Sequence, residues 1–85
     1  MYFTYILKSK SGQYYIGATN NIEERVKFHN LGKVKSTKSK RPWKLICKET
    51  YNTLSKARKR EKQIKNWKSR LAIERLINMA LSSNG

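Results

Sequence analysis

Apolar and aromatic side chains are concentrated in two short segments near the N-terminus. Residues 2–8 are rich in aromatic and β-branched types with apolar groups on both sides of an extended chain, which predicts a central strand. Ser11 and Gly12 then favour a turn, and residues 13–18 predict the returning strand. This part of the chain is therefore expected to form a β-hairpin.

A helical pattern follows the hairpin. Asn20 is expected to cap the first turn with Glu23 three residues later, and the helix should run to about Leu31 and end at Gly32. Its inward face repeats at four-residue and three-residue spacing. The residues on that face are Ile22, Val26 and His29.

The middle of the chain has no apolar periodicity at first. Residues 33–42 carry five positive charges and predict a loop on the protein surface. Residues 43–51 alternate well enough for a third strand. That strand is expected to present Trp43, Leu45 and Cys47 on one side.

Two further helices complete the pattern. Thr53 or Ser55 can cap a helix that reaches about Trp67, and Ser69 can cap the next one, with residues 82–85 as a frayed tail. The order ββαβαα predicts an α+β fold, and 85 residues fit one domain spanning residues 1–85. The apolar stripe of the last helix comprises Ile73, Leu76, Ile77, Ala80 and Leu81.

Charge narrows the range of partners. Twenty Lys and Arg against five Glu give a net charge of +15, which a small chain tolerates when its partner is a polyanion such as nucleic acid. A membrane partner is not expected, because the chain contains neither a long apolar run nor a signal-peptide pattern. Cys47 has no second thiol for a disulfide or a zinc site, so a cytoplasmic location is expected.

Glu61 interrupts the apolar face of the second predicted helix, on which Ala57 and Ile64 also lie. One interpretation is an ion pair with Arg58 or Lys65 one turn away, worth about 0.2–0.5 kcal/mol. The other is a metal ligand, because Mg²⁺ is commonly held by one or two carboxylates together with water and substrate phosphate. The spacing leaves both interpretations open.

Arg25 and His29 lie one turn apart and project to the same side of the first helix. Such a pair can clamp a phosphate, since the guanidinium neutralises its oxygens and the imidazole can donate a hydrogen bond or move a proton. The alternative is an Arg at the rim of the core and a partly buried, hydrogen-bonded His. Each residue taken alone favours that alternative.

Tyr5 and Tyr15 lie on adjacent predicted strands and share one face if the turn is centred near Lys10 and Ser11. Tyrosines in strands commonly serve only packing. Gly17 follows on the same face, and a glycine within a strand often marks the close approach of another backbone or a ligand.

The order and spacing of these residues resemble the GIY-YIG nuclease domain, in particular its small single-domain bacterial branch. The matching residues are Tyr5, then Tyr15-Ile16-Gly17 ten residues later, Arg25 and His29 on a helix, and Glu61 on a later helix. The resemblance extends from residue 2 to about residue 81. It departs from the family at Phe3-Thr4, where the family name has Gly-Ile, and at Ala18, where some DNA-repair members carry Lys.

The resemblance implies a three-stranded antiparallel sheet flanked by helices, with a hydrolytic site on one sheet face. It implies one divalent cation, Mg²⁺ or Mn²⁺, held by Glu61, and an Arg25 that stabilises charge on the phosphate. Tyr15, with Tyr5 beside it, would orient or deprotonate the attacking water, supported by His29. Lowering a phenol pKa from about 10 to about 7 takes about 4 kcal/mol, so a neutral Tyr15 that only positions water stays open.

Basic residues supply the expected nucleic-acid surface. Contacts to phosphates make binding sensitive to salt but do not read sequence, and the chain has no zinc-finger or helix-turn-helix pattern. We therefore expect DNA as the substrate, with low sequence preference or selection for a flap, branch or nick. The expected contacts are Lys33, Lys35, Lys38, Lys40 and Arg41 on the loop and Lys56, Arg58, Lys59, Arg60 and Lys62 on the second helix.

Two other functions compete with a metal-dependent endonuclease. One is a non-catalytic DNA- or RNA-binding module on the same fold, and the other is a basic structural partner of a ribonucleoprotein. The endonuclease is favoured because Arg25 and Glu61 both break local packing rules and both match the family pattern. The sequence identifies no protein partner and no oligomeric state.

Overall fold

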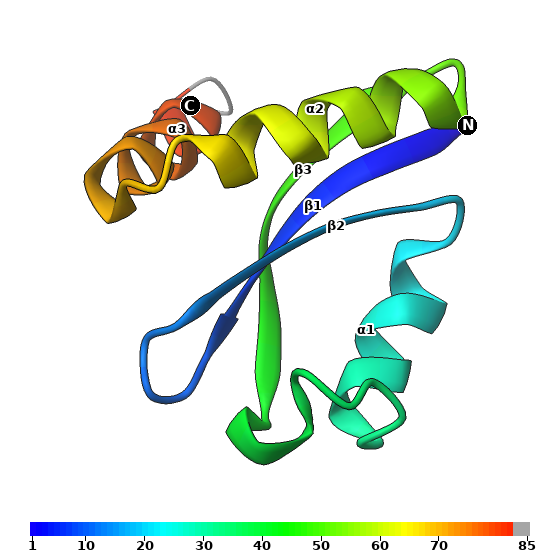
Figure 1. The fold of residues 1–85 in the computed structure, drawn as a ribbon, viewed down its shortest axis with the longest axis vertical. Coiled ribbons are helices and arrows are strands. Elements are labelled where there is room, and N and C mark those ends of the chain that lie inside the picture. The colour runs from blue at the N-terminus through cyan, green and yellow to red at the C-terminus, as the bar shows by residue number, and fades with distance from the viewer. Residues whose placement is uncertain (83–85) are drawn as a thin grey trace.

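A computed structural model of the chain describes residues 1–82 and confirms the predicted order ββαβαα. A short 3₁₀ helix, η1, precedes the third strand (Figure 1). No helix within these residues is long and apolar enough to cross a bilayer. The elements are β1 (Tyr2–Ser9), β2 (Tyr14–Thr19), α1 (Ile22–Asn30), η1 (Lys38–Lys40), β3 (Trp43–Tyr51), α2 (Leu54–Asn66) and α3 (Arg70–Ser82).

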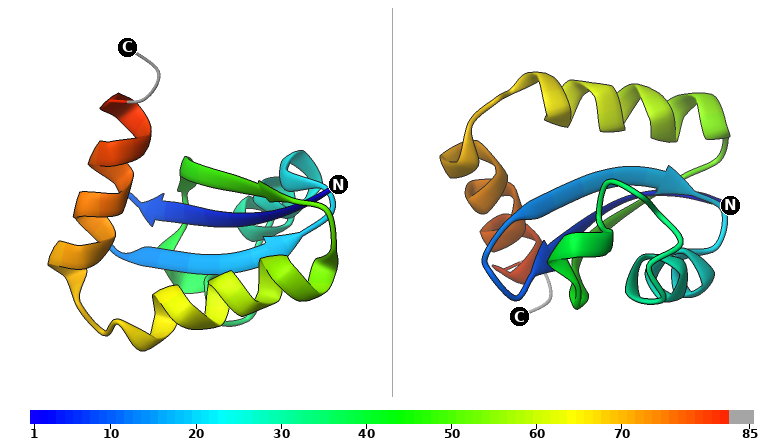
Figure 2. Two further views of the ribbon diagram at one scale, coloured as in Figure 1. Left: turned by 90° about the horizontal axis from the view of Figure 1, so that it is seen from above. Right: turned by 60° about the horizontal axis from the view of Figure 1, so that its bottom comes forward.

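The strands form one antiparallel sheet in the order β2-β1-β3, with β1 in the centre as predicted. α1 packs on one face of the sheet, and α2 and α3 pack on the other (Figure 2). The core on the α1 side contains Tyr5, Leu7 and Trp43, with Ile22 and Val26 packed against it. The opposite core contains Ile6, Ile16, Cys47 and Ile64, with Ile73, Leu76, Ile77 and Ala80 of α3 packed against it.

The predicted alternation of β3 is wrong at Cys47. Ile6 pairs with Cys47 but Leu7 pairs with Leu45, so the register between β1 and β3 shifts at this point. A one-residue slip moves the following side chains to the other face of a sheet. Leu45 therefore packs on the α1 side, whereas Cys47 belongs to the core under α2 and α3.

The first helix begins one residue later than predicted. Asn21, not Asn20, is the N-cap, and its side chain accepts a hydrogen bond from the Glu24 N–H at 3.1 Å. The reason is that β2 continues to Thr19, whose hydroxyl bonds the backbone of Asn21 and holds the connection. The predicted end at Gly32 is confirmed, and its φ of 79° is a conformation that favours glycine.

The remaining helix ends largely follow the sequence. Thr53 caps α2 and the Ser69 hydroxyl accepts a hydrogen bond from the Ala72 N–H in the first turn of α3. Ser82 is the last residue of α3, and residues 83–85 of the expected tail lie outside the described residues. Leu81, the last member of the predicted stripe, lies outside the part of the chain whose side chains are described.

The predicted surface loop, residues 33–42, is only partly on the surface. It contains η1, and Thr37 within it is buried. The Trp43 indole donates a hydrogen bond to the Thr37 carbonyl at 2.9 Å, and the Asn30 side chain bonds the Trp43 backbone on both its N–H and its C=O. These bonds fix the loop against α1 and the start of β3.

Candidate active site

A cavity of about 450 Å³ lies along the outer edge of β2. α1 and α2 pack on opposite faces of the sheet, and both reach this edge. The cavity therefore opens at the edge of the sheet. The resemblance had implied a site on one face of the sheet. Its lining residues are Tyr5, Tyr15, Gly17, Ala18, Arg25, Arg58, Glu61, Lys62 and Lys65.

Gly17 lets the side chain of Tyr5 reach the cavity from the central strand. Tyr5 pairs with Gly17 across β1 and β2, and a Cβ at position 17 would lie 2.5 Å from the Tyr5 Oη and 2.6 Å from its Cζ. A close approach does occur at Gly17, but the approaching group is the Tyr5 side chain and not the backbone or ligand that was expected. The rings of Tyr5 and Tyr15 are 6.3 Å apart on the same face, as expected.

A buried hydrogen-bond chain orients Tyr5. Its hydroxyl lies 3.2 Å from His29 Nε2, and His29 Nδ1 lies 2.8 Å from Thr37 Oγ1. The Thr37 hydroxyl donates its one proton to the Val34 carbonyl at 3.3 Å. His29 Nδ1–H must then donate to Thr37, so Nε2 is the acceptor and the Tyr5 hydroxyl is the donor.

Thr37 was missed by sequence reasoning, which placed it on an exposed loop. A lone Thr within a run of lysines carries no pattern that points to a buried partner. The structure buries Thr37 together with His29, and His29 is fully buried rather than partly buried.

Burial determines the direction of the pKa shifts of Tyr5 and His29, the two titratable residues of this hydrogen-bond chain. Burial raises the pKa of Tyr5, an effect that the Arg25 guanidinium opposes and that Tyr15 and Glu61 reinforce. Burial, and then the charge of Arg25, lower the pKa of His29 below its ordinary value. Tyr5 and His29 are therefore both neutral at neutral pH, which matches the hydrogen-bond directions.

Arg25 holds an unused donor at the cavity. Its Nε is buried and makes no hydrogen bond within residues 1–82. Buried donors are nearly always paired in native structures, so this nitrogen is unusual, and the Arg25 side chain that carries it also lines the cavity, where a guanidinium can bind an anion. Arg25 is thus neither wholly in the core nor at a solvated rim.

Glu61 makes one of the two ion pairs predicted for it, and it also lines the cavity. Its Oε2 lies 2.6 Å from Lys65 Nζ, and its side chain, 23% exposed, also lines the cavity. It is the only carboxylate there, and residues 1–82 contain no group of three acidic, His or Cys side chains that could hold a metal. One carboxylate beside an open cavity fits Mg²⁺ or Mn²⁺ completed by water and phosphate oxygens.

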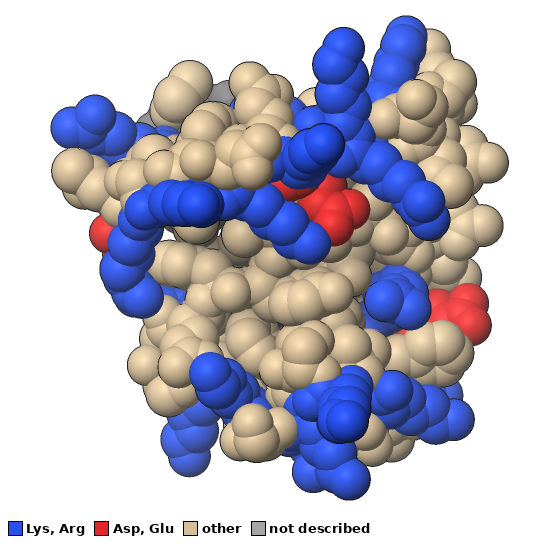
Figure 3. All heavy atoms as spheres, in the orientation of Figure 1, with Lys and Arg blue, Asp and Glu red and all other residues tan. Residues whose placement is uncertain are grey.

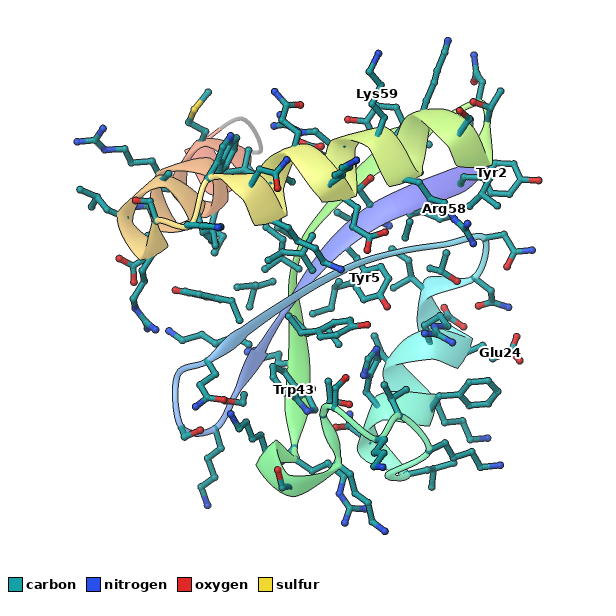
Figure 4. All side chains as sticks on the ribbon, viewed as in Figure 1. Tyr2, Tyr5, Glu24, Trp43, Arg58 and Lys59 are labelled. Atoms are coloured by element: carbon teal, nitrogen blue, oxygen red, sulfur yellow. The ribbon has the colours of Figure 1, made fainter. Side chains whose placement is uncertain are left out.

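The basic residues of the second helix divide by the side of α2 they occupy. Arg58 and Lys62 line the cavity, whereas Lys59 points away from the sheet (Figure 4). Arg60 is committed elsewhere, because its guanidinium is paired with Glu49 at 2.9 Å and stacked over a Trp ring. Arg60 is therefore the expected nucleic-acid contact that the structure makes least accessible.

Basic side chains cover two separate parts of the face that contains the cavity. Lys and Arg gather along α2 and again at the opposite end, over the loop and the end of α1, and the zone between them is mostly uncharged apart from a blue and a red group at its right-hand side (Figure 3). The five predicted loop contacts are exposed at that second end. The cavity itself carries four basic side chains against one carboxylate.

Known proteins resemble this chain in sequence and in fold. A family model described as the GIY-YIG catalytic domain matches residues 1–75. A UPF0213 protein of Staphylococcus epidermidis is 45% identical over 67 residues, covering 78% of this chain and 82% of that protein, and one of Staphylococcus haemolyticus is 40% identical with the same coverage. The UPF0213 protein of Bacillus halodurans, solved by solution NMR, matches with a TM-score of 0.59 and 31% identity over 93% of this chain and 85% of that chain. The chain therefore belongs to the GIY-YIG catalytic domain family.

Proposed function

We propose that this protein is a cytoplasmic, divalent-metal-dependent endonuclease that hydrolyses phosphodiester bonds in DNA. The observation that carries the proposal is the meeting of Tyr15, Arg25 and Glu61, from three different elements, at one basic cavity. These residues are far apart in the sequence. Tyr15 also packs against the core on the α1 side, but Arg25 and Glu61 are charged and belong to neither core cluster. Their convergence supports a chemical role.

Arg25 would bind the scissile phosphate. Its side chain lines the cavity and its Nε–H has no partner within residues 1–82, so the guanidinium has a donor left for a phosphate oxygen once the side chain turns toward it. Because the charge on phosphate oxygens grows as water attacks, a fixed guanidinium stabilises the transition state more than the ground state. Arg58 and Lys62 would hold flanking phosphates at the cavity wall.

The two tyrosines would divide the handling of water. The Tyr5 hydroxyl is already used as a donor to His29, which fixes its ring and its remaining lone pairs. The Tyr15 hydroxyl makes no hydrogen bond within residues 1–82, so it is available to accept a hydrogen bond from the attacking water. His29 would act as a positioning residue for Tyr5, because its lowered pKa disfavours holding a proton.

Glu61 would hold the metal. A divalent cation bound there would neutralise charge on the phosphate and on the leaving oxygen. Exposed lysines at both ends of the same face would bind the DNA backbone on either side, with affinity that falls as salt rises. Such contacts support low sequence preference or selection by DNA shape.

A plasmid-nicking assay in Mg²⁺ and in Mn²⁺ tests the proposal, with wild type, Tyr15→Phe, Arg25→Ala and Glu61→Ala compared side by side and DNA binding measured in parallel. Wild type should nick DNA, chelator should stop it, and each variant should be slower by about 100-fold or more while still binding. Wild type that binds DNA without cutting it in either metal would favour the non-catalytic alternative. Equal residual cleavage in all four proteins would indicate contamination and refute the assignment.

A further inference from the structure

Lys65 is bonded to the one carboxylate of the cavity. Its Nζ lies 2.6 Å from Glu61 Oε2 and 5.8 Å from the centre of the Tyr15 ring. Lys65 also lines the cavity, so its ammonium group lies near both the carboxylate and the Tyr15 ring. Sequence reasoning considered it only as a helix-surface partner of Glu61.

Lys62 provides a natural comparison within the same helix. It lines the same cavity and carries the same charge, but within residues 1–82 it makes no ion pair with Glu61. Long-range electrostatic effects on the carboxylate are therefore shared by the two lysines. Among the two lysines, Lys65 is the one bonded to Oε2.

We propose that Lys65 is the cation that occupies Glu61 before the metal arrives, and that metal binding displaces it. The inference rests on the proposed metal site at Glu61. A divalent ion on this carboxylate would face an ammonium already bonded to the same oxygen, and two cations at such a distance repel each other. Among residues 1–80, whose side chains are described, no second carboxylate lines the cavity to share the charge, so the metal and Lys65 compete for one ligand.

The Lys65 stem gives the displaced ammonium a place to go. The side chain is 47% exposed and has four rotatable methylene groups, so it can swing without disturbing the core. The Tyr15 ring already lies within reach of its Nζ. Lys65 thereby sets the metal concentration at which the site loads, and its charge stays at the cavity wall, where it can meet a phosphate.

Side-chain NMR of the isotope-labelled full-length protein, titrated with MgCl₂, tests this directly. Signals of Lys65 Nζ and Cε should move with the same midpoint as the Glu61 carboxyl carbon, while the Lys62 signals move much less. Lys65→Met should bind Mg²⁺ about two- to fivefold more tightly than the matched control Lys62→Met, as expected for removing a partly exposed ion pair. Both substitutions keep a good helix former on an exposed face, so folding should persist.

The outcomes separate the two proposals. Mg²⁺ binding that shifts Glu61 but leaves Lys65 unmoved, with equal affinities in the two Met variants, would overturn the role of Lys65 and leave the metal site standing. Absence of Mg²⁺ binding that depends on Glu61, checked with Glu61→Gln, would overturn both.

Discussion

Replacing Gly17 by Ala should damage the molecule at the point where Tyr5 crosses β2. The new Cβ would lie 2.5, 2.6 and 3.0 Å from Oη, Cζ and Cε1 of Tyr5. Contacts under 3 Å between such atoms force a shift. Tyr5 is 1% exposed and its hydroxyl is bonded to His29, so the ring cannot move without breaking that bond.

The size of the loss follows from three effects. Overpacking a well-filled site costs roughly 1–3 kcal/mol. Leaving the buried His29 nitrogen without its donor costs roughly 1–3 kcal/mol more. Ala in place of Gly within a strand returns roughly 0.5–1 kcal/mol, so the free energy of unfolding should fall by about 3 kcal/mol.

Urea or thermal unfolding measures this loss, and a domain of this size should lose about 12–24 °C in Tm. The control is the same substitution in a Tyr5→Leu background, which lacks the hydroxyl and the nearest ring carbon. There the cost of Gly17→Ala should drop by about 1.5 kcal/mol or more. A loss below about 0.5 kcal/mol in the wild-type background, or an equal loss in both, would refute the view that Gly17 makes room for Tyr5.

Two further predictions concern His29 and Arg60. His29 is the single histidine and its pKa is lowered in the folded state, so the unfolded chain binds more protons below pH 6.5. The free energy of unfolding should therefore rise with pH up to about 6.5, by at most about 1.4 kcal/mol per pH unit. Urea unfolding of His29→Gln should show a weaker dependence of this free energy on pH. A slope unchanged in that variant would contradict the burial of a neutral imidazole. Arg60→Ala should lower the free energy of unfolding by about 1 kcal/mol, because it removes the ion pair with Glu49. It should reduce DNA affinity less than Arg58→Ala, which removes the same charge at the cavity. Equal losses of affinity, measured by fluorescence anisotropy, would contradict the different roles of the two arginines.

Much of the fold was accessible from local patterns. The strand and helix order, the central position of β1, and the caps at Thr53 and Ser69 depend on side-chain types within a few residues. The misplaced Cys47 and the late N-cap have a different origin. A register shift between β1 and β3 and a hydroxyl bond from Thr19 arise from pairing and turn geometry that no single segment encodes.

The sequence predicted those site residues that interrupt the apolar face of a helix. Arg25 and Glu61 stood out because charged groups appeared on inward faces, and both line the cavity. Nothing in the basic loop distinguishes Thr37, and the sequence indicated Lys65 only as a possible ion-pair partner of Glu61. The position of each at the site arises only when the fold brings Thr37 to His29 and the Glu61–Lys65 pair of α2 to Tyr15.

The central claim is that the protein hydrolyses phosphodiester bonds at the cavity on the edge of β2, with Glu61 as the residue that holds the metal. The most direct measurement is the single-turnover cleavage rate of a labelled DNA duplex at saturating protein with Mg²⁺, for wild type, Glu61→Gln and the control Glu23→Gln on an exposed turn of α1. The account predicts that Glu61→Gln binds DNA at least as well as wild type but cuts it at least about 100-fold more slowly. Glu23→Gln should cut at the wild-type rate. Equal rates for Glu61→Gln and wild type would contradict it.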